Sequence, residues 1–377
     1  MKILIITENV GGTAPGIVFE RLIKGISKIH DVDVLTSDFD PSIEKFEINN
    51  LITINRQKVH PRIHKFLISI FGISPLDWIW SKKSIFHVRD QKYDLVISLI
   101  SFHHYSALLL GNIFTKQFKV RFMVYSVDAN PAPLGWSKDN LYFRMVKKMM
   151  AKYLPQADYF FSANEQMLAY QLKTFKGKET LVTGVLFNPN FGKLIKYDFK
   201  NRNYCFLYTG GIYGVRKVEY VINGFRKFLA SYPNSSLEFV GSSIPKDVLD
   251  VLSKEERAKI IFHPFTKNLK PFYERSTALL DIDADLENDV FLSSKIINYI
   301  AVNRIIISET GPNSPSRKLF KGIPSIIQCD HNEDAIAEAM KRAINLYQDV
   351  DFYDRSKVLS LFDLNSIVSN LNRIILN

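Results

Sequence analysis

The stretch YCFLYTGGIYGVRK, residues 204–217, decides the fold, because a continuous apolar run ends there in a glycine-rich turn. An earlier stretch, KILIITENVGGTAPG at residues 2–16, has the same order of apolar run and glycines. Apolar residues at helical spacing follow each of them, at 17–29 and at 219–229. A strand, a turn and a helix in this order build parallel sheets. The sequence therefore predicts two successive α/β halves of similar length.

Further buried strands alternate with helical stretches in both halves. Short apolar runs predict these strands at 31–37, 93–101, 121–129, 156–164, 236–243, 258–265, 277–283 and 304–310. Such alternation implies doubly wound parallel sheets with right-handed crossovers, that is, two Rossmann-like domains. We expect the domains at residues 1–192 and 204–350, a linker at 193–203, and a C-terminal helix within 351–377 that crosses back to the first domain.

The composition is that of a globular protein, with 46% hydrophobic and 23% charged residues in a chain of 377. It excludes disorder, collagen and coiled coil. The two cysteines, Cys205 and Cys329, are far apart and lack the spacing of a zinc site or a disulfide framework. Because no apolar run is long enough for a signal peptide or a membrane span, we expect a cytoplasmic protein.

Positive charge is concentrated in the first half of the chain. Residues 51–150 carry 15 Lys and Arg against 5 Asp and Glu. This surplus indicates an anionic partner, either nucleic acid, an anionic membrane or a phosphate-bearing ligand; a well-solvated surface is the alternative. Within it, residues 57–83 interleave cations with Phe, Ile and Trp. That mixture is typical of a membrane interface, although a helical hairpin packed on the first domain would look the same.

Two cations follow the second glycine turn. Gly210 and Gly211 leave the end of a strand, and Arg216 and Lys217 come before the next helix. Arginine can bind two phosphate oxygens at once, so a flexible turn that presents both cations at a strand end suits a diphosphate. The alternative is a solvated pair on the first helical turn, where cations oppose the helix dipole.

A helix start near residue 293 is a second candidate anion site. Ser293 and Ser294 are natural N-cap residues, Lys295 opens the helix, and Asn298 lies about one turn further on nearly the same face. Backbone N–H groups, hydroxyls and a lysine converge there, which favours an anion. Serine caps are common, so an ordinary cap is the alternative.

The first half has polar residues of its own at predicted strand ends. The loop at 11–16 lies between a strand and a helix, where glycines such as Gly12 let the backbone approach a ligand and the helix start favours an anion, so Gly12 is a candidate donor-binding residue. It lacks the spacing of dinucleotide-binding motifs, and a tight turn is the alternative. His103, His104 and Asp128 follow predicted strands, at the carboxyl ends where open α/β sheets bind ligands. Ordinary packing at a helix start is the alternative for the histidines.

In their order, these segments resemble the GT-B glycosyltransferases, particularly the retaining, family-4-like enzymes of bacterial surface polysaccharide synthesis. The matching stretches are KILIITENVGGTAPG, YDLVISLIS, VYSVDANPAPLGW, QADYFFSANEQ, LYTGGIYGVRKVEYVINGF, LEFVGSS and, above all, FLSSKIINYIAVNRIIISETGPNSP. The resemblance covers nearly the whole chain. It implies two Rossmann-like domains facing a cleft, a nucleotide-sugar donor held mainly by the second, and a hexosyltransferase activity that retains anomeric configuration.

The resemblance also implies roles for the residues named above. The diphosphate of a UDP- or GDP-sugar would be neutralised by Arg216 with Lys217 or Lys295, and capped by the amides of the two serines before Lys295. Asn298 would contact the donor ribose, although the family usually has Glu there. The family often carries a functional His or Asp where Asp128 stands, and Asp128 could orient or deprotonate the acceptor hydroxyl.

The same resemblance implies partners and a mechanism without a bound cofactor. The acceptor would be a glycan or a polyprenyl-linked sugar at the inner face of the cell membrane, on the side of the histidines. No metal is expected, because side chains and helix dipoles stabilise the leaving diphosphate in this family. Asp281, Asp283 and Asp285 resemble a metal-binding run, but the doubly wound pattern argues against the glycosyltransferase fold that uses one.

Two other functions are alternatives. A nucleotide-sugar epimerase on the same scaffold would need clearer acid and base groups than the sequence offers. A basic nucleic-acid-binding protein is the second alternative, but no RNA- or DNA-binding motif is present, so no nucleic acid is expected.

Overall fold

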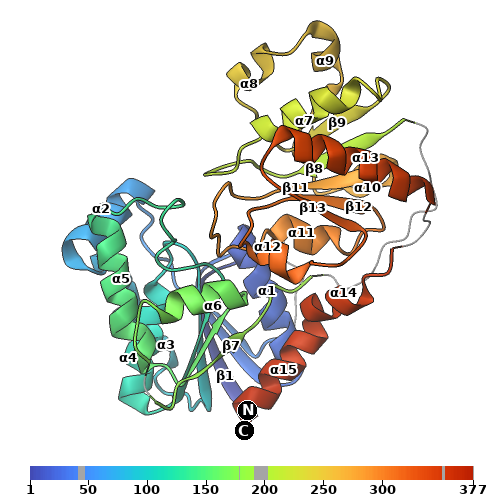
Figure 1. Ribbon diagram of the computed structural model, residues 1–377. Coiled ribbons are helices and arrows are strands. Elements are labelled where there is room, and N and C mark those ends of the chain that lie inside the picture. The colour runs from blue at the N-terminus through green and yellow to red at the C-terminus, as the bar shows by residue number, and fades with distance from the viewer. Residues whose placement is uncertain (41–46, 178, 191–202, 350–352, 377) are drawn as a thin grey trace. The chain divides into compact units, whose positions relative to one another are not determined.

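The computed structural model describes residues 1–40, 47–177, 179–190, 203–349 and 353–376. The chain divides into two compact units. Unit 1 comprises Met1–Pro189 and Asp363–Asn377, and unit 2 comprises Asn190–Phe362. Each unit is a parallel α/β fold, which confirms the predicted fold class (Figure 1). Apart from Asn203, the linker expected at 193–203 lies outside the described residues.

Unit 1 is built on a seven-stranded parallel sheet in the order β3-β2-β1-β4-β5-β6-β7. Helices on both faces bury its central strands, which explains their continuous apolar runs; in β4 all six residues are buried. The strands are β1 (Lys2–Val10), β2 (Asp31–Phe39), β3 (Asn50–Thr53), β4 (Leu95–Ile100), β5 (Arg121–Ser126), β6 (Tyr159–Ser162) and β7 (Val182–Val185).

Two groups of helices cover the faces of this sheet (Figure 1). One face carries α1 (Ala14–Ser27) and α15 (Leu364–Leu376); the other carries α2 (Pro61–Phe71), α3 (Pro75–Val88), α4 (Ser106–Phe118) and α5 (Leu141–Tyr153). Helix α6 (Glu165–Leu172) follows β6. Gly25 lets α15 approach α1, since a Cβ there would lie 2.6 Å from the Val368 side chain. The last helix of the chain therefore completes the first unit.

Unit 2 has a six-stranded parallel sheet in the order β10-β9-β8-β11-β12-β13. Its strands are β8 (Cys205–Thr209), β9 (Ser236–Val240), β10 (Ile260–His263), β11 (Ala278–Ile282), β12 (Ile305–Glu309) and β13 (Ile326–Cys329). Helices α7 (Glu219–Leu229) and α13 (Glu333–Asp349) share an apolar core with the sheet, in which Phe225 and Met340 are fully buried. The other described helices are α8 (Lys246–Asp250), α9 (Lys254–Ala258), α10 (Lys270–Arg275), α11 (Ser294–Tyr299), α12 (Pro315–Leu319) and α14 (Ser356–Phe362).

The strand order reverses beside the first strand of each sheet, β1 in unit 1 and β8 in unit 2. Open α/β sheets bind ligands at such a switch point, outside the carboxyl ends of the strands. In unit 1 this point joins the end of β1 with the turn after β4. In unit 2 it joins the glycine turn after β8 with the acidic run after β11. Most of the candidate residues therefore lie where ligands are expected.

Three strands and one strand end differ from the sequence-based prediction. β1 continues through Glu8, Asn9 and Val10, beyond the apolar run that predicted it. The prediction missed β3, β7 and β13. Segment 57–83 holds two helices, α2 and most of α3, so the helical part of the hairpin alternative is correct. Among the described residues, no helix is long and apolar enough to cross a membrane.

Candidate functional site

The glycine turn of unit 2 lies directly against a lysine. Gly210 and Gly214 have φ of 93° and 71°, which L side chains rarely adopt. A Cβ on Gly210 would lie 3.1 Å from Cε of Lys295. The Tyr208 hydroxyl donates to the carbonyl of Gly211 at 3.0 Å and so holds the turn on the strand end. The turn thus places backbone, rather than side chains, beside a cation.

Arg216 lies in this turn, ahead of α7, and not on the first helical turn. Its guanidinium carbon is 4.7 Å from the centre of the Tyr213 ring, a cation–π distance. Burial opposes its charge, but Tyr213 and Asp283 outweigh that effect and raise the pKa of Arg216. The arginine is therefore held as a cation at the switch point, as the diphosphate hypothesis requires.

The structure brings Lys295 next to Arg216. The ammonium of Lys295 is 5.9 Å from the same Tyr213 ring and 5.3 Å from that of Tyr208. Burial and the positive charge of Arg216 lower the pKa of Lys295 to about 8. Two cations that repel each other are therefore gathered by aromatic rings at one point. An anion bound between them would relieve that repulsion.

The serines before Lys295 have different environments. Ser293 is the N-cap of α11: its hydroxyl accepts from the Lys295 N–H at 3.3 Å and donates to Asp281 at 2.6 Å. Ser294 and Asn298 are exposed on α11. The Ser293 hydroxyl is thus occupied by contacts within the fold. A ligand at this helix start would be bound by backbone N–H groups instead.

Lys217 pairs with Asp285 and does not join Arg216 and Lys295. Its ammonium is 2.6 Å from Asp285, and this pairing raises the pKa of the lysine. Asp283 accepts from Thr310 at 3.2 Å, and Asp281 from Ser293. The three aspartates therefore have separate partners. Within the described ranges, no group of three or more His, Cys, Asp or Glu side chains could hold a metal ion.

A cavity of about 430 Å³ opens beside Arg216. Its lining is mixed, with the turn after β8 on one side and the segment after β9 on the other: Ile212, Tyr213, Gly214, Arg216, Val218, Glu219, Ser243, Ile244 and Pro245.

A second pair of polar residues, which the sequence analysis missed, lies at the ends of β12 and β13. There the buried Glu309 carboxylate lies 2.8 Å from His331, and burial raises the pKa of Glu309 to about 7.

In unit 1 the two histidines of the predicted site point to different partners. His103 has a φ of 67°, and its ring hydrogen-bonds to the Tyr142 hydroxyl. Burial, together with positive charge from Lys65 and two histidines, lowers its pKa to about 3, so it is neutral. His104 instead places Nδ1 2.7 Å from Glu8, and its side chain is 41% exposed. The backbone turn at His103 thus separates the two rings.

Glu8 is the functional candidate that the sequence analysis missed. Its buried carboxylate accepts from His104, from Arg56, and from the N–H and hydroxyl of Ser106, at 2.9 and 2.5 Å for the serine. Burial opposes its ionisation, but His104, Arg56 and Ser106 hold the pKa of Glu8 at about 2. A charged residue at the end of an otherwise apolar strand was the signal that could have revealed it.

Asp128 and Gly12 lie at the same edge of the unit 1 sheet. The Phe102 N–H donates to Asp128 at 3.0 Å, so this carboxylate fixes the turn that carries the histidines. Burial raises the pKa of Asp128. Gly12 has a φ of 66° and precedes Thr13, which caps α1 by accepting from the Gly16 N–H at 3.1 Å. Asp128 thus has a positioning contact, and its role toward an acceptor stays a prediction.

The two Rossmann-like units give this chain the fold of the GT-B glycosyltransferases, because solved structures with that fold match it over its full length. No family model and no curated protein matches the sequence. Among solved structures it is similar to Anabaena HepE in complex with UDP and glucose, at 12% identity and TM-score 0.68 over 100% of both chains.

Two further structures are similar over nearly the full length. The lipopolysaccharide outer core galactosyltransferase WaaB is 15% identical, with TM-score 0.62 over 100% of this chain and 99% of its own. A Listeria monocytogenes protein named as a UDP-N-acetylglucosamine 2-epimerase is 14% identical, with TM-score 0.57 over 99% and 97%. At these identities the similarity establishes the fold alone. The similar structures include both glycosyltransferases and an epimerase.

Proposed function

We propose that this protein is a glycosyltransferase that moves a sugar from a nucleotide-sugar donor to a hydroxyl of a glycan or lipid-linked acceptor. The observation that carries the proposal is the pairing of Arg216 and Lys295 around the Tyr213 ring, at the switch point of unit 2. Two cations beside a glycine turn match a diphosphate in charge. HepE, which shares the fold, binds UDP and glucose.

The chemistry follows from where charge develops. When the glycosidic bond to the diphosphate breaks, negative charge builds on the phosphate oxygens, and cations fixed beside them stabilise the transition state more than the ground state. Arg216 and Lys295 would supply this stabilisation without a bound metal. Retention of anomeric configuration, and a role in bacterial polysaccharide synthesis, follow from the family resemblance and are part of the proposal.

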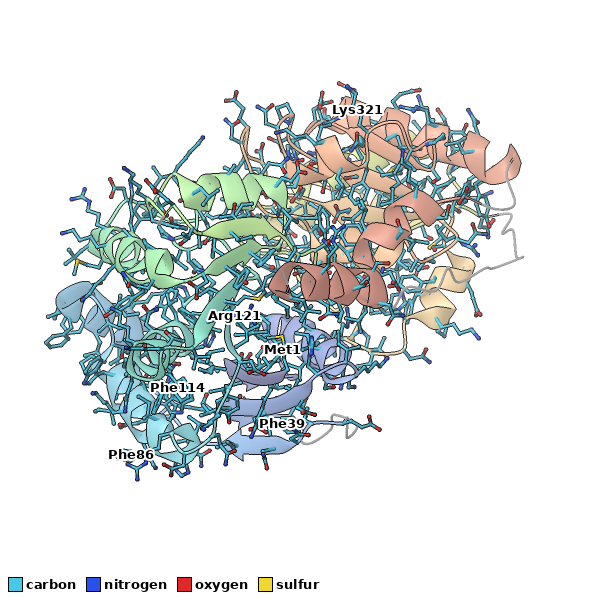
Figure 2. All side chains as sticks on the ribbon, turned by 90° about the horizontal axis from the view of Figure 1, so that it is seen from below. Met1, Phe39, Phe86, Phe114, Arg121 and Lys321 are labelled. Atoms are coloured by element: carbon cyan, nitrogen blue, oxygen red, sulfur yellow. The ribbon has the colours of Figure 1, made fainter. Side chains whose placement is uncertain are left out.

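We further propose that the protein reaches its lipid-linked acceptor by binding a membrane through one surface of α2 and α3. Exposed apolar side chains form one stripe on each helix: Ile63, Phe66, Ile70 and Phe71 on α2, and Trp78, Ile79 and Phe86 on α3. Figure 2 labels Phe86 of α3, 64% exposed, and Phe114 of α4, which is buried. The inner face of α3 is partly polar, with Asp77, Ser81 and Ser84 buried. Helices that expose their aromatic residues and bury polar ones suit a bilayer interface.

Cations border the same stripes. Lys65 on α2, and Lys82 and Lys83 on α3, are exposed, and the ammonium of Lys82 is 5.0 Å from the Trp78 ring centre. Exposed apolar side chains beside cations suit an anionic bilayer, and no nucleic-acid-binding motif accompanies them. We therefore propose peripheral binding to an anionic membrane at its cytoplasmic face. The protein should co-sediment with anionic vesicles but not with neutral vesicles, and added salt should release it.

A donor panel tests the function. The melting temperature should rise with one class of UDP-, GDP-, dTDP- or CMP-sugar, because ligand at 100 times its Kd adds about 2.7 kcal/mol to the free energy of unfolding. With that donor and a lipid-linked sugar acceptor, a glycoside should form, and NMR of its anomeric proton reports retention or inversion. An epimerised nucleotide sugar made without acceptor would instead establish the epimerase, and no stabilisation by any donor would contradict both.

A further inference from the structure

A buried charged cluster surrounds His104 at the switch point of unit 1. It draws on four separate parts of the unit: Glu8 from β1, Arg56 from the segment after β3, Asp77 from α3 and His104 from the turn after β4. The carboxylates of Glu8 and Asp77 are buried. Charges assembled from such distant segments cannot result from local sequence preferences, so the fold holds them there.

One arginine serves both carboxylates. A guanidinium nitrogen of Arg56 bonds Glu8 and lies 3.2 Å from Asp77, whose other oxygen is 3.3 Å from His64 on α2. Burial raises the pKa of Asp77, whereas Glu8 stays ionised. Arg56 is thus shared between two acids, and His104 is the second cationic partner of Glu8.

The hydrogen bond to Glu8 fixes which ring nitrogen of His104 faces the substrate side. An ionised carboxylate only accepts, so Nδ1 carries a proton and donates to Glu8. Nε2 is then the ring nitrogen that Glu8 does not use, on a side chain that is 41% exposed. The groups that face the ring are Glu8, Arg56 and Asp77, together with Asp128 after β5.

Burial lowers the pKa of His104, but the charge and hydrogen bond of Glu8 outweigh it and raise that pKa, with Arg56 opposing and Asp77 assisting. Lys65 and His64 lie near the same turn, since both lower the pKa of His103. An imidazolium N–H that is not used by Glu8 favours a negatively charged ligand oxygen, because charge-assisted hydrogen bonds are the stronger ones.

We propose that His104 meets the substrate as an imidazolium whose Nε2–H donates to a phosphate oxygen, and that Glu8 and Arg56 are positioning residues that fix its ring and charge. The inference rests on the proposed function and adds to it a phosphate contact in unit 1. The phosphate can belong to the donor nucleotide or to a lipid-linked acceptor, since the recognising chemistry is the same. A protonated ring cannot also be a general base, so the acceptor proton must leave by another route.

The pKa of His104 is measurable without any activity, by NMR titration of its Cε1–H in the full-length protein. Glu8→Gln should lower the proton affinity of His104 at least tenfold, whereas Arg56→Met should raise it. Opposite shifts would establish that Glu8 and Arg56 set the charge of His104, and the ligand probes below then test the phosphate contact. Lys58→Met is the matched control: it removes a positive charge from the same segment, but Lys58 is exposed and pairs with Asp38, so the pKa should not change.

Two probes then locate the phosphate. If UDP raises the pKa of His104, the donor supplies the phosphate; if a short prenyl diphosphate does so, the acceptor supplies it. Either result supports the proposal, and no shift with either probe overturns it. Should Glu8→Gln fail to fold, Arg56→Met and the two probes still decide.

The pH profile separates this inference from the proposed function. The value of kcat/KM should fall as pH rises through the measured pKa of His104, and His104→Gln, which keeps a neutral donor, should lose that limb. Activity that instead rises through this pKa would make His104 a base and overturn the inference. If the titrations behave as expected but no sugar is transferred with any donor, only the proposed function fails.

Discussion

The switch points of the two units have the same topology but different charge arrangements: opposite charges are paired in unit 1, and two cations lie together in unit 2. In unit 1, Glu8 is surrounded by partners of opposite charge and has its hydrogen bonds satisfied within the unit. In unit 2, Arg216 and Lys295 are like charges that share one aromatic ring, and Asp281 and Asp283 offset only part of their repulsion. A balanced network stabilises the fold, whereas gathered like charges cost stability until a ligand neutralises them. The comparison predicts that mutations in unit 1 affect stability most and those in unit 2 affect catalysis most.

The largest effect should follow Glu8→Gln, on the stability of unit 1. The pKa of Glu8 falls from 4.5 to about 2 on folding, so its contribution is fully present above pH 4.5 and is lost as pH falls through 2. That shift corresponds to about 3 kcal/mol at neutral pH. Urea denaturation at pH 7 should show this loss in the variant, and the difference from wild type should shrink at pH 3. Equal stability at pH 7 would contradict the balanced network.

Arg216→Ala should lower kcat/KM on the order of 100-fold, equivalent to about 2.7 kcal/mol, with little change in the free energy of unfolding. Arg216→Lys should restore only part, because an ammonium cannot bind two oxygens in the same way. Arg226→Ala is the control, since Arg226 lies on α7 and pairs with Glu256. Near-normal turnover in Arg216→Ala with loss in Lys295→Ala would move the diphosphate to the start of α11. Activity in both variants, abolished by a chelator, would direct attention to the aspartates after β11.

A smaller effect concerns Lys295 and pH. Its pKa of about 8 lies below the ordinary value of 10.5, so the cation is present below pH 8 and is lost above it. We expect the affinity for UDP to fall by about tenfold between pH 7 and pH 9.5, by analogy with the loss of one charged hydrogen bond. Calorimetry at both pH values measures this. Lys295→Arg should abolish the dependence, and an unchanged one would assign it to another group.

The smallest effect separates the membrane surface from both sites. Lys82→Gln should weaken binding to anionic vesicles by about 1 kcal/mol, the value for one cation near a charged bilayer. Lys341→Gln, an exposed lysine on α13 of unit 2, is the matched control and should bind like the wild type. Equal loss in both variants would mean that net charge, rather than the surface on α2 and α3, drives the binding.

Periodicity predicted the strands inside both sheets, and the three described strands that it missed, β3, β7 and β13, each have four residues and lie at a sheet edge. The run at Leu95–Ile100 is buried throughout, so its sequence is continuously apolar and was recognised as a strand. Both missed strands of unit 1 are short and half exposed: β3 lies at one edge of the sheet and β7 at the other. Such strands are held by hydrogen bonds to a single neighbouring strand, and these bonds leave no pattern in the amino-acid sequence.

The candidate site was predictable where one segment holds the residues and hidden where the fold assembles them. Arg216 and Lys295 were each recognised from their own turn or helix start. Their common contact with Tyr213 was not, because it joins segments about 80 residues apart. Arg56 and Asp77 gave no signal at all, since a charged residue in a basic amphipathic segment reads as solvent-exposed. Only the tertiary structure shows that they are partners of Glu8.

The position of α15 has a consequence for biosynthesis. Ile367, Val368, Leu371 and Ile375 belong to the core beneath α1, yet they are translated only after unit 2. At about 5–20 residues per second, the rest of unit 1 waits roughly ten to thirty seconds while unit 2 is translated. During that time the apolar face of α1 lacks its cover. Unit 1, whose translation begins before that of unit 2, is therefore completed only after unit 2, and its uncovered apolar face can meet chaperones in the meantime.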